Sequence, residues 1–200
     1  MKYLLLLLIS LSLTQAIDSI EIKDRYNKSY NYEKMAQFSE AIKVVVPIYN
    51  KYPKGYMINL RLGWLFYLNN KTLNSTKYYK QASLITPSAI APKLGLIKIY
   101  LNQANFTEAE LLTYNILKLD YYNYYGNYYT IIALIGEKKY DIAIEIIQKM
   151  LALYPVDIIF LEQLFIAYKA TNNSYIETLY NNILTIDPNN LLINSIVVVE

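Results

Sequence analysis

Signals that end helices recur along this chain at a step of 34 residues, and this spacing limits the possible folds more than any other feature. Pro53 and Pro87 lie one step apart, and Pro155 lies two steps further on. Proline ends a helix because it lacks an N–H and clashes with the preceding turn. A large, mostly aromatic residue keeps the same step, at Tyr32, Phe66, Tyr100, Leu134 and Tyr168. A small residue keeps it too, at Ala41, Ser75, Ala109 and Ala143. A fixed period of this kind is typical of a repeat array.

Each repeat is predicted to be a pair of helices. In residues 56–87, an apolar helix covers 57–68, a polar turn covers 69–72 and a second helix covers 73–85. Five such pairs are predicted, over about residues 22–55, 56–87, 90–121, 124–155 and 158–188. Stacked pairs bury a continuous core that no single pair can bury. We therefore expect an all-α solenoid of helix-turn-helix repeats that winds as a right-handed superhelix.

Local signals predict how particular helices begin and end. Thr107 with Glu110 three residues later fits a capping box, in which each side chain satisfies a free N–H. Ser174 is predicted to cap the last long helix. Pro47 is expected to kink the helix predicted over 38–49 or to shift its boundary. The first helix carries Arg25 and Lys28 where later repeats have apolar residues, as expected of a terminal, capping repeat.

The N-terminus has the pattern of a secretory signal peptide. Residues 1–16 combine one positive charge, an apolar core from Leu4 to Leu13, and Ala16 at the expected cleavage site. An apolar core of about ten residues is too short to span a bilayer of ~30 Å. We expect a secreted or periplasmic mature chain with no membrane span after cleavage. An uncleaved anchor and a buried N-terminal helix are the alternatives.

The predicted domain order follows from these signals: a signal peptide (1–16), a linker (17–21), the repeat domain (22–188) and a C-terminal capping segment (189–200). The apolar tail over 191–200 favours a short packing helix. A β-branched end that contacts another chain is the alternative.

Composition excludes several classes of function. The net charge is only +3 with scattered lysines, so a nucleic-acid partner is not expected. The chain has no cysteine and no histidine, which removes disulfides, thiolate metal sites and the usual base at neutral pH. We find no phosphate-binding loop, nucleophile elbow or paired catalytic carboxylates. The sequence therefore predicts neither an enzyme nor a cofactor.

The repeat resembles the tetratricopeptide repeat over nearly the whole mature chain. The match in the second repeat comprises Leu62-Gly63, Phe66, Ser75, Tyr79, Ala82 and Pro87. The matches elsewhere are Tyr32, Phe38, Ala41, Pro53, Leu96, Tyr100, Phe106, Ala109, Tyr140, Ala143, Pro155, Leu164 and Tyr168. In two repeats the tryptophan of the family's first helix is replaced, by Asn59 and Lys93.

The resemblance implies that the first helix of each pair lines an inner groove. Projection by repeat position predicts these groove residues: Tyr26, Tyr30, Leu60, Trp64, Tyr67, Leu94, Lys98, Tyr125, Tyr128, Ile132, Glu162 and Lys169. Leu60, Trp64 and Tyr67 share one helix face, separate from the core face. A helix that is apolar on both faces presents a binding surface or is buried twice. Both interpretations are open at this point.

The expected function is that of a non-catalytic adaptor or scaffold of the cell envelope, which binds a protein or peptide in the groove. The lysine-and-asparagine clamp that some family members use for a peptide carboxylate is not evident. Apolar and stacking contacts are therefore expected to hold the partner. The alternative is a carbohydrate-binding accessory, in which Trp64, Tyr67, Tyr125 and Tyr128 stack on a glycan of the envelope polysaccharide or peptidoglycan.

Overall fold

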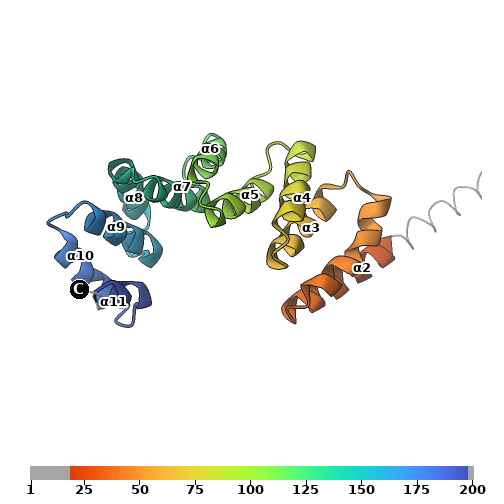
Figure 1. Ribbon diagram of the computed structural model, residues 1–200, viewed down its shortest axis with the longest axis horizontal. Helices are drawn as coiled ribbons and strands as arrows, with labels where there is room; N and C mark the ends of the chain where they lie inside the picture. The colour runs from red at the N-terminus through yellow and green to blue at the C-terminus, as the bar shows by residue number, and fades with distance from the viewer. Residues whose placement is uncertain (1–18, 198–200) are drawn as a thin grey trace, which may run out of the picture. The chain divides into compact units, whose positions relative to one another are not determined.

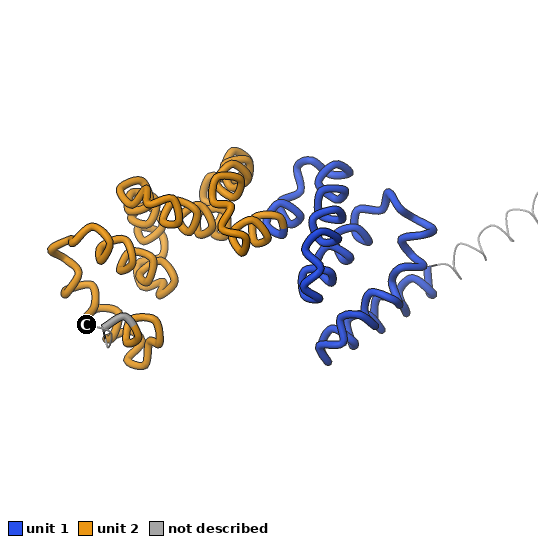
Figure 2. Tube along the Cα trace, in the orientation of Figure 1, with its two compact units in different colours: residues 1–95 blue, residues 96–200 orange. Residues whose placement is uncertain are grey.

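The computed structural model describes residues 19–197, in which helices alternate with short turns (Figure 1). The helices are one over residues 19–34, α2 (Phe38–Lys51), α3 (Tyr56–Leu68), α4 (Thr72–Ile85), α5 (Ala91–Asn102), α6 (Phe106–Leu117), α7 (Tyr124–Gly136), α8 (Tyr140–Leu153), α9 (Ile158–Ala170), α10 (Ile176–Ile186) and α11 (Leu191–Val197). The chain divides into two compact units, residues 1–95 and 96–200, and the division falls inside α5 (Figure 2).

Within each unit, consecutive helices pack against one another. In unit 1, α2 contacts α3 and α3 contacts α4; in unit 2, contacts link α6 to α7, α7 to α8, α8 to α9 and α9 to α10. No strand occurs within residues 19–197. The predicted fold class, an all-α solenoid of helix pairs, is confirmed.

The turn inside each helix pair has the same backbone conformation and lies at the same position in every repeat. Within residues 19–197, five non-glycine residues have positive φ values between 52° and 61°: Ala36, Asn70, Ala104, Lys138 and Asn172. The residue after each one donates its N–H, over 2.8 to 2.9 Å, to the carbonyl of Tyr32, Phe66, Tyr100, Leu134 or Tyr168. This is the hydrogen bond of a Schellman motif, which satisfies a free carbonyl at a helix end. The large residue that marks the period therefore also accepts the hydrogen bond that closes its turn.

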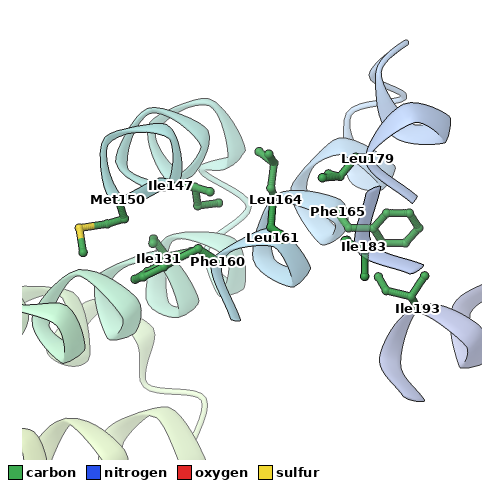
Figure 3. Packing of buried hydrophobic residues seen from close by; sticks show 10 residues of the cluster. All are labelled: Ile131, Ile147, Met150, Phe160, Leu161, Leu164, Phe165, Leu179, Ile183 and Ile193. Atoms are coloured by element: carbon green, nitrogen blue, oxygen red, sulfur yellow. The ribbon is translucent and has the colours of Figure 1, made fainter. Parts of the chain in front are cut away.

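The core contains the small residues of the period. Ala41, Ser75, Ala109 and Ala143 are all fully buried, which lets the helices approach closely. The large residues pack beside them: Leu134 is fully buried, whereas Tyr32, Phe66 and Tyr168 are half-buried against the core clusters of their units. Figure 3 shows the cluster of unit 2, in which Ile193 of α11 lies beside Ile183 and Phe165.

A tyrosine occupies space that two glycines leave in unit 1. The buried ring of Tyr79 lies where a Cβ at Gly63 would come within 2.6 Å and a Cβ at Gly95 within 2.4 Å. Burial raises the pKa of the Tyr79 hydroxyl above its ordinary value. Gly63 thus makes room for a side chain of α4.

Three local predictions are wrong. The Thr107–Glu110 capping box is absent: Asn105 is the N-cap of α6 without a side-chain bond, and the Thr107 hydroxyl donates to Glu137 Oε1 at 2.5 Å. Ser174 does not cap α10, whose N-cap is Tyr175, again without a side-chain bond. Residues 19–21, predicted as linker, are already helical.

Other local features differ less from the predictions. α2 continues through Pro47 to Lys51. In the tail, α11 forms and Ile193 is fully buried. The predicted signal peptide lies outside the described residues.

Candidate partner-binding site

A hollow of about 280 Å³ lies between the helix over 19–34 and α3 in unit 1. Its lining consists of Tyr26, Tyr30, Glu33, Met57, Leu60, Arg61 and Trp64. We call it the Trp64 hollow. Four of the predicted groove residues, Tyr26, Tyr30, Leu60 and Trp64, come together here.

Helical spacing explains why these side chains converge. Tyr26, Tyr30 and Glu33 succeed one another at intervals of four and three residues, so they share one face of their helix. Leu60 and Trp64 share a face of α3 in the same way. The opposite face of α3 buries Ile58, Leu62 and Leu65 in the core, which explains why this helix has apolar residues on both faces.

The floor of the hollow is a closed polar network. The Arg61 side chain, only 6% exposed, donates to Ser29 Oγ from Nη2 at 2.9 Å and from Nε at 3.2 Å. Its Nη1 donates to Glu33 Oε2. The other oxygen, Glu33 Oε1, accepts from Trp64 Nε1 at 2.6 Å. Both oxygens of Glu33 are therefore engaged, and one carboxylate holds both the guanidinium and the indole.

Aromatic rings cover this network. The Tyr30 ring centroid lies 4.0 Å from Arg61 Cζ, a cation–π contact. Tyr67 stacks against Trp64 with ring centroids 5.8 Å apart and planes 21° apart. Burial, and then the neighbouring Tyr30, raise the pKa of Tyr26, while Arg61 opposes them. The surface offered is thus apolar rings with hydroxyl tips, with Tyr30 and Met57 exposed at its edge.

In unit 2 the predicted groove residues occupy several environments. Tyr125 is exposed and stacks on Tyr129 at 6.2 Å, and Tyr128 lies 5.2 Å from the same ring. Glu162 Oε1 accepts from Asn190 Nδ2 at 2.7 Å. Lys169 lines a second hollow, between α9 and α10. Lys98 and Ile132 of unit 2 are half-buried, as is Leu94, a predicted groove residue of unit 1.

Three residues of the hollow, Glu33, Met57 and Arg61, were not predicted from the sequence. One signal was present, because Arg61 is the only charged residue in α3, a helix that is mostly apolar. A buried charge requires a partner. The identity of that partner, Glu33, depends on the packing of two different repeats and is not readable from local sequence.

The described part of the chain lacks two further kinds of feature. No group of three metal-ligating side chains occurs within residues 19–197. No helix in that range has both the length and the apolarity needed to cross a membrane.

Comparison with solved structures identifies the architecture. A tetratricopeptide repeat protein from Parabacteroides merdae ATCC 43184 is similar with a TM-score of 0.80 at 16% identity, covering 88% of this chain and 70% of that chain. The chain has the tetratricopeptide-repeat fold. A MamA crystal structure has a TM-score of 0.73 at 13% identity, covering 84% of this chain and 92% of that chain. MamA from Desulfovibrio magneticus RS-1 has a TM-score of 0.72 at 13% identity, and the match covers 83% of this chain and 93% of that chain.

The similarity lies in structure, since these identities are low. No family model matches the sequence, and no curated protein matches it either. The predicted resemblance to the tetratricopeptide repeat is therefore confirmed at the level of the fold.

Proposed function

We propose that this chain is a non-catalytic adaptor of the cell envelope, which holds a segment of a partner protein against the Trp64 hollow. The observation that carries the proposal is the network in which Glu33 fixes both Arg61 and Trp64. Rings held in place before binding lose little conformational entropy when a partner arrives. The repeat fold and the signal-peptide pattern of residues 1–16 support an adaptor that acts outside the cytoplasm.

The polar floor argues for an apolar anchor on the partner. Arg61 is engaged by Glu33 and Ser29, so a ligand carboxylate would have to displace an existing pair. The rings of Tyr26 and Trp64 and the side chain of Leu60 instead offer contact to an aliphatic or aromatic side chain. Tryptophan and tyrosine contribute most where such an anchor is fully desolvated.

Site-specific crosslinking in the native host tests this proposal. A photoreactive amino acid at Met57, which is 60% exposed at the edge of the hollow, should yield one dominant protein adduct. Trp64→Ala should abolish the adduct, because the indole forms a wall of the hollow. Tyr154→Ala removes an exposed tyrosine of unit 2 and serves as the matched control. An adduct that survives Trp64→Ala, or no protein adduct, contradicts the proposal.

A carbohydrate partner is the second candidate, and the stacking of Trp64 on Tyr67 favours it. The two stacked rings are nearly parallel and both are half-buried, so a sugar ring could add a further layer on an outer face of the stack. Titration with soluble peptidoglycan fragments and envelope polysaccharide, monitored by the fluorescence of the single tryptophan, separates the two candidates. A saturable change that Tyr67→Ala removes supports the glycan. No change, together with a protein adduct at Met57, supports the adaptor.

A further inference from the structure

A lysine between two tyrosines lies in unit 2, where the loop between α6 and α7 meets α8. Lys149 of α8 donates from Nζ to Oδ1 of the buried Asn127, at 2.5 Å. The same Nζ lies 4.1 Å from the ring centroid of Tyr121 and 5.9 Å from that of Tyr122, and both are cation–π contacts. We call these four residues the Lys149 corner. The corner shares no residue with the Trp64 hollow.

The ammonium of Lys149 has capacity for a further partner. An ammonium has three N–H donors, and one of them is bonded to Asn127. Within residues 19–197, no carboxylate pairs with Lys149, whose other contacts of charge are with the two tyrosine rings. Burial lowers the pKa of Lys149, because the charge is partly removed from water. A negative charge on a ligand would offset this loss, so charge complementarity favours an anion.

The fold does not require these side chains. Proline occupies the repeat position of Tyr121 in three other loops between pairs, at Pro53, Pro87 and Pro155. The neutral residues Gln81 and Asn115 occupy the position of Lys149 in the two preceding pairs. In unit 1 the residue that corresponds to Asn127 is Asn59, and its buried Oδ1 has no hydrogen-bond donor among the described residues. A pair of this kind therefore folds without a lysine on that oxygen.

The two rings of the corner give it a shape as well as a charge. Tyr121 and Tyr122 are both more than half exposed. Their ring centroids lie 4.9 Å apart with the planes at 79°, so the rings form two walls of different orientation. A tyrosine offers a flat apolar face and a hydroxyl at its tip. This combination suits a sugar, which has an apolar face of C–H groups and a rim of hydroxyls.

We propose that the Lys149 corner binds an acidic sugar, a hexuronate residue of an oligosaccharide. The sugar carboxylate would pair with Lys149, while the C–H face of the same ring stacks on Tyr121 or Tyr122. An acidic side chain of a peptide fits less well. It would gain the weak attraction of a partly exposed ion pair, but its flexible stem has no flat face to cover the rings.

Isothermal titration calorimetry of the full chain tests the proposal, with tetrasaccharides of galacturonate and of mannuronate as probes. We expect saturable binding of at least one of them, and none after its carboxylates are reduced to alcohols. Lys149→Gln should weaken binding by about tenfold or more, because it removes the charge but keeps an N–H donor for Asn127. Lys80→Gln removes the same charge from an exposed position of α4 and should leave binding unchanged.

A second pair of variants tests the rings. Tyr121→Ala should weaken binding by about fivefold, because one wall of the corner is lost. Tyr175→Ala, at an exposed position of unit 2, is the matched control and should bind like the parent. Far-UV circular dichroism checks that all four variants fold.

The outcomes are distinct. The proposal is overturned if neither uronate binds, if the reduced sugar binds equally well, or if Lys149→Gln leaves binding unaltered. Hexaglutamate that binds as tightly as the uronate also overturns it and assigns the corner to an acidic peptide. Trp64→Ala should not change uronate binding, which separates this test from that of the proposed function.

Discussion

Asn59 and Asn127, two repeats apart, use their side chains in the same way. Asn59 Nδ2 donates to the carbonyls of Pro53 and Gly55, both at 2.8 Å. Asn127 Nδ2 donates to the carbonyls six and four residues before it, those of Tyr121 and Asn123, at 3.0 and 2.9 Å. In the repeat between them, Lys93 Nζ bonds the equivalent carbonyls, those of Pro87 and Ala89. A side-chain donor at this position therefore closes three successive loops between repeats.

Asn59→Ala is expected to lower the unfolding free energy of unit 1 by about 1–3 kcal/mol, because two loop carbonyls lose their donor in a buried place. Urea unfolding monitored by the fluorescence of Trp64 measures this loss. Asn74→Ala, at an exposed position of α4, is the control and should stay within about 0.5 kcal/mol of the parent. Equal effects of the two variants would contradict this role of Asn59.

Ala104→Gly is expected to stabilise the chain by roughly 0.5–1 kcal/mol. Ala104 has φ of 53°, a conformation that costs an L-residue with a Cβ about 1–2 kcal/mol and costs glycine little. Ala152→Gly, in the last turn of α8, should instead destabilise by about 0.5–1 kcal/mol. Thermal unfolding monitored by circular dichroism measures the change in stability of each variant, which should be a gain for Ala104→Gly and a loss for Ala152→Gly. A loss of stability in Ala104→Gly would show that the turn gains nothing from glycine.

Gly95→Ala is expected to destabilise unit 1 by about 1–3 kcal/mol. The new Cβ would lie 2.4 Å from Cζ of Tyr79, and Gly63 bounds the same ring, so the ring has little space to retreat. Gly126→Ala is the control, since its nearest neighbours are side-chain methyl groups of Ile116 and Leu117 at 3.1 Å. In a Tyr79→Leu background the penalty of Gly95→Ala should shrink. If Gly95→Ala costs as much in the Tyr79→Leu background as in the parent, the new Cβ does not clash with the Tyr79 ring.

Glu137→Gln is expected to reduce the loss of stability at acid pH. The hydrogen bond from Lys139, and then that from Thr107, lower the pKa of Glu137 below its ordinary 4.5, against the effect of burial. Because the folded-state pKa is depressed, the stabilisation is complete above the unfolded-state pKa and is lost as pH falls through the folded value. Urea unfolding at pH 6 and pH 3 should show a smaller difference for Glu137→Gln than for the parent. Glu145→Gln, at an exposed position in α8, should behave like the parent.

The sequence predicted the fold well because the signals that set it are local and repeated. Ala41, Ser75, Ala109 and Ala143 were identified from spacing, and all four are buried. One error arose where a side chain bonds a distant repeat. Thr107 reaches Glu137, thirty positions away, instead of capping its own helix. The sequence of α6 alone cannot predict this contact between Thr107 and Glu137.

The location of four candidate site residues was predicted for the same reason, and their role in binding a partner stays a prediction. Tyr26, Tyr30, Leu60 and Trp64 lie at repeat positions that projection can assign, and they meet in one hollow. The pairing of Glu33 with Arg61 links two different repeats, and only the folded chain brings these residues together. Residues that line a groove can thus be predicted from repeat positions, whereas an ion pair between two repeats cannot.

The recurring turn has a consequence for how a chain of this kind can change length. Ala104 and Lys138 have nearly the same backbone conformation, and each is succeeded by the same hydrogen bond to the preceding helix. Joining residue 104 directly to residue 139 would restore that turn while removing one whole repeat. Genetic recombination between such points can therefore shorten or lengthen the protein in whole repeats, without requiring a new connection between helices.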